Sequence, residues 1–121
     1  MDDDETIQMG MQVFLGELGY DVKSTEDGAT AVSEYKLHFE NGNRYDAVIL
    51  DLTIPGGMGG VEALKQLTRI DPDVTAIISS GYANDPTMAE HRKYGFKGVL
   101  MKPFKPAELA QCLKEALSAE S

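Results

Sequence analysis

The sequence predicts an α/β protein built around a parallel β-sheet, and two observations carry this prediction. Short apolar runs bounded by turn residues alternate with segments whose apolar residues recur every three or four positions. The run at residues 47–50 is apolar throughout, which is typical of a strand covered on both faces. Such alternation produces βαβ units with helices on both sides of the sheet. At 121 residues, the chain is expected to form one domain, residues 1–121.

The first third of the chain predicts two helices separated by a strand. One helical stripe is formed by Ile7, Met11, Phe14 and Leu18, and Gly19 follows as a helix-ending residue. Residues 20–25 alternate in polarity and are expected to form a short strand. Asp27 can cap the second helix, whose apolar side carries Val32, Tyr35 and Phe39.

The rest of the chain continues the alternation. The predicted strands lie at residues 47–51, 74–78 and 98–101. A glycine-rich loop, residues 56–60, precedes a helix with Val61, Leu64 and Leu67 on one face. A short polar helix is expected from Pro86, preceded by Asn84 or Asp85, to about Tyr94. Pro106 opens the last helix, whose apolar positions are Leu109, Cys112, Leu113 and Ala116.

The composition limits the classes of partner. The net charge of −9, from 20 acidic and 11 basic residues, disfavours direct binding to nucleic acid. No apolar run approaches the roughly 20 residues of a membrane span, so no membrane insertion is expected. The single cysteine excludes an internal disulfide and suits a reducing cytoplasm, where we expect the protein to lie.

Polar residues at the predicted strand ends suggest a reactive site. Asp51, Ser80 and Lys102 lie at the carboxyl ends of three predicted strands, and Asp2 and Asp3 precede the first helix. The carboxyl ends of parallel strands meet at one edge of a sheet. Three carboxylates gathered there would repel one another, so a hard divalent cation such as Mg²⁺ is their natural partner. Such an ion leaves room for a phosphoryl group, with Asp51 as nucleophile and Lys102 and Ser80 contacting the phosphoryl oxygens.

The same residues carry a family resemblance. Asp2-Asp3, the segment Leu-Asp-Leu-Thr-Ile-Pro at 50–55, Ser80-Gly81 and Lys102-Pro103 occur in the order seen in receiver domains of two-component response regulators. The resemblance implies a flavodoxin-like, doubly wound parallel sheet of order 2-1-3-4-5 with five helices. The glycine loop at 55–60 resembles that of receivers in hybrid sensor histidine kinases.

The resemblance also implies a role for each site residue. Asp51 matches the phosphoacceptor, Ser80 the switch hydroxyl and Lys102 the conserved-type lysine, whose bond to Pro103 is expected to be cis. The metal, Mg²⁺ or Mn²⁺, is expected to be held by Asp2, Asp3, Asp51 and the backbone carbonyl of Thr53. Within this set, Asp3 is expected to bind directly and Asp2 mainly through water.

Three departures from the family pattern stand out. The loop at 55–60 looks one residue longer than the usual form and lacks its acidic residue. Val99 occupies a position where many receivers carry an aromatic switch residue. An alternating fold also calls for a strand before Asp2, and this first strand is apparently missing from the sequence. Three explanations stay open: the sequence covers only an ordered part, the chain is cut short, or a partner chain fills the gap by strand exchange in a dimer.

The resemblance implies a phosphoacceptor signalling domain of a two-component phosphorelay. It would receive its phosphoryl group from the phosphohistidine of a sensor histidine kinase or a histidine phosphotransfer domain, docked against the first helix. It would assist its own modification without being an enzyme that turns over an external substrate. One alternative is a pseudo-receiver that only binds partners. Another is an aspartate-nucleophile phosphatase, which is disfavoured because Thr53 stands where a second acid is needed.

Overall fold

The computed structural model describes residues 1–82 and 84–118. Within these residues the chain forms three strands, β1 (Val48–Asp51), β2 (Ala76–Ser80) and β3 (Gly98–Met101). The helices are α1 (Glu5–Glu17), α2 (Gly28–Glu40), α3 (Gly60–Ile70), α4 (Pro86–Ala89), α5 (His91–Tyr94) and α6 (Pro106–Ser118). No helix in this part of the chain is long and apolar enough to cross a membrane.

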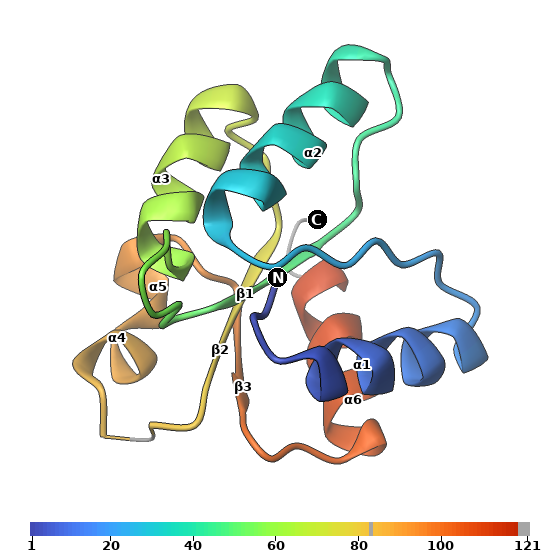
Figure 1. The fold of residues 1–121 in the computed structure, drawn as a ribbon, viewed down its shortest axis with the longest axis vertical. Coiled ribbons are helices and arrows are strands. Elements are labelled where there is room, and N and C mark those ends of the chain that lie inside the picture. Colours follow the sequence, from blue (N-terminus) through green and yellow to red (C-terminus); the bar gives the residue numbers. More distant parts are fainter. Residues whose placement is uncertain (83, 119–121) are drawn as a thin grey trace.

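The strands form one parallel sheet in the order β1-β2-β3. Asp51 lies opposite Ser79, and Ser80 lies opposite Met101, so all three strands end at the same edge. Figure 1 shows α2 and α3 on one side of the sheet and α1 and α6 on the other. The predicted α/β doubly wound class is therefore confirmed, and the three strands correspond to the last three positions of the predicted order.

Two apolar cores lie on opposite faces of the sheet because side chains alternate along each strand. On one face Leu50 and Ile78 pack against α2 and α3, with Leu64 and Leu67 fully buried. On the other face Ile77 packs against α1 and α6 in a second cluster, whose other buried members are Leu15, Leu100, Leu109, Leu113 and Ala116. The sheet is thus covered on both sides, as its continuous apolar strands predict.

The predicted strand at residues 20–25 is wrong, since this segment has no regular secondary structure. It runs past the amino terminus on its way from α1 to α2 (Figure 1). Among the described residues, its backbone is paired toward the sheet by one bond, from the Asp2 N–H to the Thr25 carbonyl at 3.0 Å. A strand needs a neighbouring backbone along its whole length to complete a ladder, and within the described part of the chain only the backbone of Asp2 pairs with this segment from the sheet side.

The helix predicted from Pro86 to Tyr94 divides at Glu90 into α4 and α5. Asp85 caps α4 by accepting a hydrogen bond from the Thr87 N–H at 2.9 Å. Gly95, at a φ of 97°, ends α5. The structure therefore has six helices among its described residues where the resemblance implies five, because one polar segment contains two short turns.

Candidate phosphoacceptor site

The site lies where the strands end. Asp51 is the last residue of β1, Ser80 the last residue of β2, and Lys102 directly follows β3. Asp51 and Ser80 are almost fully buried, with 6% and 2% of their surface exposed. Asp2 is also buried and comes from the chain ahead of α1. The parallel topology therefore gathers residues from four separate segments at one edge.

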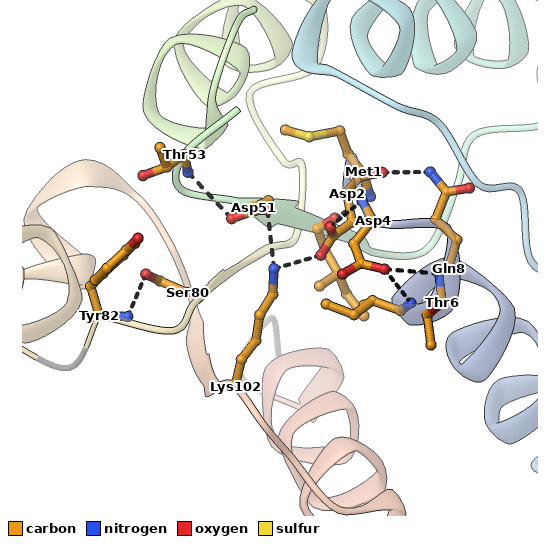
Figure 2. A network of polar contacts seen from close by, with 12 residues as sticks. Met1, Asp2, Asp4, Thr6, Gln8, Asp51, Thr53, Ser80, Tyr82 and Lys102 are labelled. Carbon is orange, nitrogen blue, oxygen red and sulfur yellow. Dashed lines mark hydrogen bonds and ion pairs between the residues drawn. The ribbon is translucent and has the colours of Figure 1, made fainter. Parts of the chain in front are cut away.

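Lys102 joins the two buried carboxylates. Its Nζ lies 2.6 Å from Oδ2 of Asp2 and 3.0 Å from Oδ2 of Asp51. Figure 2 shows the lysine side chain reaching up between the two acids. Its peptide bond to Pro103 is cis, as the resemblance predicts. An ammonium group is compact and has three N–H donors, so it can donate to two carboxylates at once.

The backbone around Asp2 is held from both sides. The Met1 amino group donates to the Ile49 carbonyl at 2.7 Å, and the Asp51 N–H donates to the Met1 carbonyl at 3.1 Å. The Gln8 side-chain amide donates to the Asp2 carbonyl and, at 3.0 Å, to the Thr25 carbonyl. These bonds fix the acidic residue beside Asp51.

Asp3 and Asp4 follow Asp2 but make different contacts. Asp3 is exposed, and its carboxylate belongs to a group with Asp2 and Asp51 in which one oxygen of each lies within 4.8 Å of the others. Asp4 is the N-cap of α1, accepting hydrogen bonds from the N–H groups of Thr6 at 2.8 Å and Ile7 at 3.3 Å. Only the first of the two therefore joins the acidic group.

The acidic group fits a divalent cation. Three carboxylates whose oxygens lie this close supply the hard oxygen donors that Mg²⁺ takes, and magnesium commonly fills its remaining positions with water and phosphate oxygens. Lys102 now balances part of the negative charge of Asp2 and Asp51. The donor set is therefore suited to Mg²⁺ or Mn²⁺ and not to a metal that prefers nitrogen or sulfur.

Ser80 and Thr53 border the carboxylates. The Ser80 hydroxyl accepts a hydrogen bond from the Tyr82 N–H at 3.0 Å, which leaves its own proton available for another acceptor. The Thr53 N–H donates to Oδ1 of Asp51 at 3.3 Å (Figure 2). The defined contact of Thr53 is thus made by its N–H, and the metal-binding role of its carbonyl stays a prediction.

Burial and charge shift the protonation of the site in identifiable directions. Burial raises the pKa of Asp51, more than the hydrogen bond and charge of Lys102 lower it. Burial lowers the pKa of Lys102, but its hydrogen bonds to Asp2 and Asp51 outweigh this, and the pKa lies above its usual value. Burial lowers the pKa of the Met1 amino group. Lys102 therefore stays cationic, while ionised Asp51 carries a cost of desolvation.

Two glycines let the loop after β1 pass close to the site. A Cβ on Gly59 would meet the carbonyl oxygen of Leu52, and a Cβ on Gly60 would lie 2.9 Å from the carbonyl oxygen of Asp51. Gly60 is also the first residue of α3. The glycines at this point of the loop are explained by close packing against the backbone that carries Asp51.

The predicted site residues Asp2, Asp3, Asp51 and Lys102 lie together, and Ser80 ends the neighbouring strand. Val99 is partly buried and packs against the core on the α2 and α3 side. Sequence reasoning missed two supporting residues, Gln8 and Asp4. An aspartate directly before a helical stripe is an N-cap signal and could have revealed Asp4. No local sequence pattern indicates that the Gln8 side chain donates to two backbone carbonyls, those of Asp2 and Thr25.

Known proteins resemble this chain over nearly all of its length. Residues 1–114 match the family model of the response regulator receiver domain. The chemotaxis protein CheY of Thermotoga maritima is 29% identical over 95% of this chain and 92% of its own length. The sensor kinase CckA of Brucella abortus is 32% identical over 99% of this chain, which spans only 12% of that kinase.

The fold also matches a solved receiver domain. The receiver domain of a Pseudomonas aeruginosa sensor histidine kinase, solved with a magnesium ion coordinated in its active-site cleft, is 27% identical with a TM-score of 0.82. The match covers 98% of this chain and 93% of that one. The family match covers residues 1–114. The acidic group and the cis bond between Lys102 and Pro103 are the features that the resemblance predicts. This chain belongs to the response regulator receiver domain family.

Proposed function

We propose that this chain is a phosphoacceptor domain of a two-component phosphorelay, in which Asp51 receives a phosphoryl group from a phosphohistidine. The observation that carries the proposal is the grouping of Asp51 with Asp2, Asp3 and Lys102 at the carboxyl edge of the sheet. A nucleophilic carboxylate next to a cation and a hard-metal donor set is the equipment that phosphoryl transfer requires.

The reaction is a displacement at phosphorus. An oxygen of Asp51 forms a bond to phosphorus as the bond from phosphorus to the histidine nitrogen breaks, and the ring nitrogen keeps the electron pair. Mg²⁺ bound by Asp2, Asp3 and Asp51 would neutralise charge on the phosphoryl oxygens. Water later cleaves the phosphorus–oxygen bond, which releases phosphate and restores the carboxylate.

Lys102 and Ser80 position the phosphoryl group. Before transfer, Lys102 pairs with Asp51 at 3.0 Å, and the same ammonium group can turn to a phosphoryl oxygen once the carboxylate is esterified. The Ser80 hydroxyl, whose oxygen already accepts from Tyr82, can donate its proton to another phosphoryl oxygen. When Asp51 is modified, Lys102 would thus change its partner and Ser80 would gain one, which is the local event of a switch.

The protein is proposed to be a switch in the cytoplasm and not an enzyme with an external substrate. Its partner would be a sensor histidine kinase or a histidine phosphotransfer domain. The exposed apolar side chains of α1, Met9 and Val13, support docking of such a partner on this helix, which begins directly after the acidic group. Phosphorylation then biases a two-state equilibrium by the difference in affinity between the states.

The test is the intact mass after incubation with a small-molecule phosphodonor and Mg²⁺. We expect a gain of about 80 Da, one phosphoryl group, that requires the metal and is abolished by Asp51→Asn. Asp73→Asn is the matched control, because Asp73 is exposed and lies at the opposite end of β2. No gain from a folded chain would reject the phosphoacceptor role and leave a domain that only binds partners.

A further inference from the structure

Ser79 carries a buried hydroxyl group that has no role in the site described above. Only 3% of the residue is exposed, and its hydroxyl oxygen has no hydrogen-bond partner among the described residues. A buried polar group that stays unpaired costs free energy, because it gives up its hydrogen bonds to water. Native proteins keep few such groups, so this one calls for a reason.

The register of the sheet places Ser79 directly beside Asp51. The two residues are paired across β1 and β2, and the Leu52 N–H donates to the Ser79 carbonyl at 2.8 Å. The preceding pair on the same face, Ile49 and Ile77, lies in the core on the α1 and α6 side. Because side chains alternate along a strand, Asp51 and Ser79 face this same side, one pair closer to the reactive edge.

Lys102 reaches Asp51 across the strand that carries Ser79. Leu100 of β3 is the partner of Ser79, and Lys102 follows two positions later on the same face. The sheet order places β2 between β1 and β3. The lysine side chain therefore crosses the end of β2 to bring Nζ within 3.0 Å of Oδ2 of Asp51. Asp51 and Lys102 thus flank Ser79 on this face, above a core that is apolar.

The contacts of the unmodified site leave no oxygen of Asp51 that needs this hydroxyl. Oδ1 accepts a hydrogen bond from the Thr53 N–H at 3.3 Å, and Oδ2 accepts one from Lys102 at 3.0 Å. Phosphorylation would convert one of these oxygens into an ester oxygen, and the ammonium group would turn to the phosphoryl group. The other oxygen would become the carbonyl oxygen of the acyl phosphate, to which the lysine no longer donates. An acceptor would thus open beside Ser79 in the modified state.

We propose that Ser79 is a positioning residue of the phosphorylated state, in which its hydroxyl donates a hydrogen bond to the carbonyl oxygen of phosphorylated Asp51. This inference rests on the proposed function. The two neighbouring serines then contact different groups: Ser80 donates to the phosphoryl group, and Ser79 donates to the carboxyl group that carries it. Because the Ser79 hydroxyl is unpaired before the modification and paired after it, its hydrogen bond favours the phosphorylated state.

The test measures the binding of beryllium trifluoride, an ion with the shape and charge of a phosphoryl group that binds reversibly to a carboxylate oxygen. Calorimetric titration in the presence of Mg²⁺ compares the wild type with Ser79→Ala, which removes the hydroxyl, and with Ser79→Thr, which keeps it. Ser33→Ala is the matched control, because Ser33 is exposed on α2. Urea unfolding and titration with Mg²⁺ alone report on the unmodified state.

Ser79→Ala should weaken the affinity for beryllium trifluoride by about fivefold, which corresponds to the loss of one ordinary hydrogen bond. Ser79→Thr and Ser33→Ala should keep the affinity of the wild type. The urea midpoint and the affinity for Mg²⁺ alone should not fall in Ser79→Ala, because the hydroxyl has no partner to lose in the unmodified site.

Three results would overturn the inference while leaving the proposed function intact, provided that the wild type still gains the phosphoryl mass. The first is an unchanged affinity of Ser79→Ala for beryllium trifluoride. The second is an equal loss of its affinity for Mg²⁺ alone, since the hydroxyl would then act on the unmodified site. The third is equal weakening by Ser79→Thr, since the hydroxyl would then not be the group that matters. A wild type that neither gains the phosphoryl mass nor binds beryllium trifluoride would reject the proposed function and this inference with it.

Discussion

Asp2 and Lys102, 100 positions apart in the chain, form a largely buried ion pair in which Oδ2 and Nζ lie 2.6 Å apart. The same Nζ lies 3.0 Å from Oδ2 of Asp51, so one ammonium group serves two carboxylates. Without the lysine, the two buried acids would lose the cation that contacts them both. The stability of the fold therefore depends on this lysine balancing the negative charge of the two acids.

Replacement of Lys102 by methionine should strongly destabilise the protein near neutral pH. Removal of one partner from a fully buried ion pair costs about 3–5 kcal/mol, because the remaining charge is left uncompensated. Lys102 is partly exposed, so the loss here is expected at or below the lower end of that range. The loss should shrink in acid, where the carboxylates become protonated, and on addition of Mg²⁺. Urea unfolding checks this, with Lys65→Met as control, since Lys65 is exposed on α3. Equal losses in the two variants would contradict the expectation.

Asp51→Asn should stabilise the protein at neutral pH in the absence of divalent cations. Burial raises the pKa of Asp51 in the folded state, so its contribution to stability is full below the unfolded pKa and is lost as pH rises through the folded value. The variant removes this loss. Its advantage should disappear below about pH 4, the ordinary range of an aspartate pKa. The free energy of unfolding as a function of pH measures this, and a variant less stable than the wild type at neutral pH would refute it.

Asp3→Asn should weaken Mg²⁺ binding by about tenfold, equivalent to about 1.4 kcal/mol, with little change in stability. Asp3 is exposed but belongs to the acidic group with Asp2 and Asp51. Asp4→Asn is the matched control: it removes the same charge from the next residue, and asparagine also caps helices well. Calorimetric titration with Mg²⁺ compares them. Equal affinities in the two variants would exclude Asp3 as a ligand.

Gly59→Ala should destabilise the protein by about 1–3 kcal/mol, the usual cost of a forced backbone shift in a packed region. The added methyl group would meet the Leu52 carbonyl oxygen. Gly81→Ala is the control, because a Cβ there meets no atom within 4 Å. Thermal or urea unfolding compares the two variants. The loop packing described above would be wrong if Gly59→Ala proved as mild as Gly81→Ala.

The sequence predicted the elements that rest on local pattern. Asp51 could be placed at a strand end because four apolar residues precede it and a proline–glycine turn follows. Asp27 could be recognised as a helix cap, and it accepts a hydrogen bond from the Thr30 N–H at 2.8 Å. Both predictions depend on neighbours within a few residues, which a linear pattern records.

The features that depend on distant neighbours were harder to predict. Residues 20–25 have the composition of a strand but lack a partner along their length, and no local signal reports that. Lys102 could be placed at a strand end, but its pairing with Asp2 joins distant parts of the chain, and no local signal reports that contact. The buried Ser79 hydroxyl has no hydrogen-bond partner among the described residues, and no sequence pattern reports this.

The register of the sheet has a consequence for insertions and deletions. Asp51, Ser80 and Lys102 end or follow three consecutive strands, and successive side chains of a strand point to opposite faces. Deletion of a single residue within β2 would turn every following side chain of that strand to the other face. A deletion in the exposed connection at residues 41–44 leaves the register untouched. A change in the length of a strand is thus expected to disrupt the site as much as replacement of the residue at its end. The connection at residues 41–44 can vary in length.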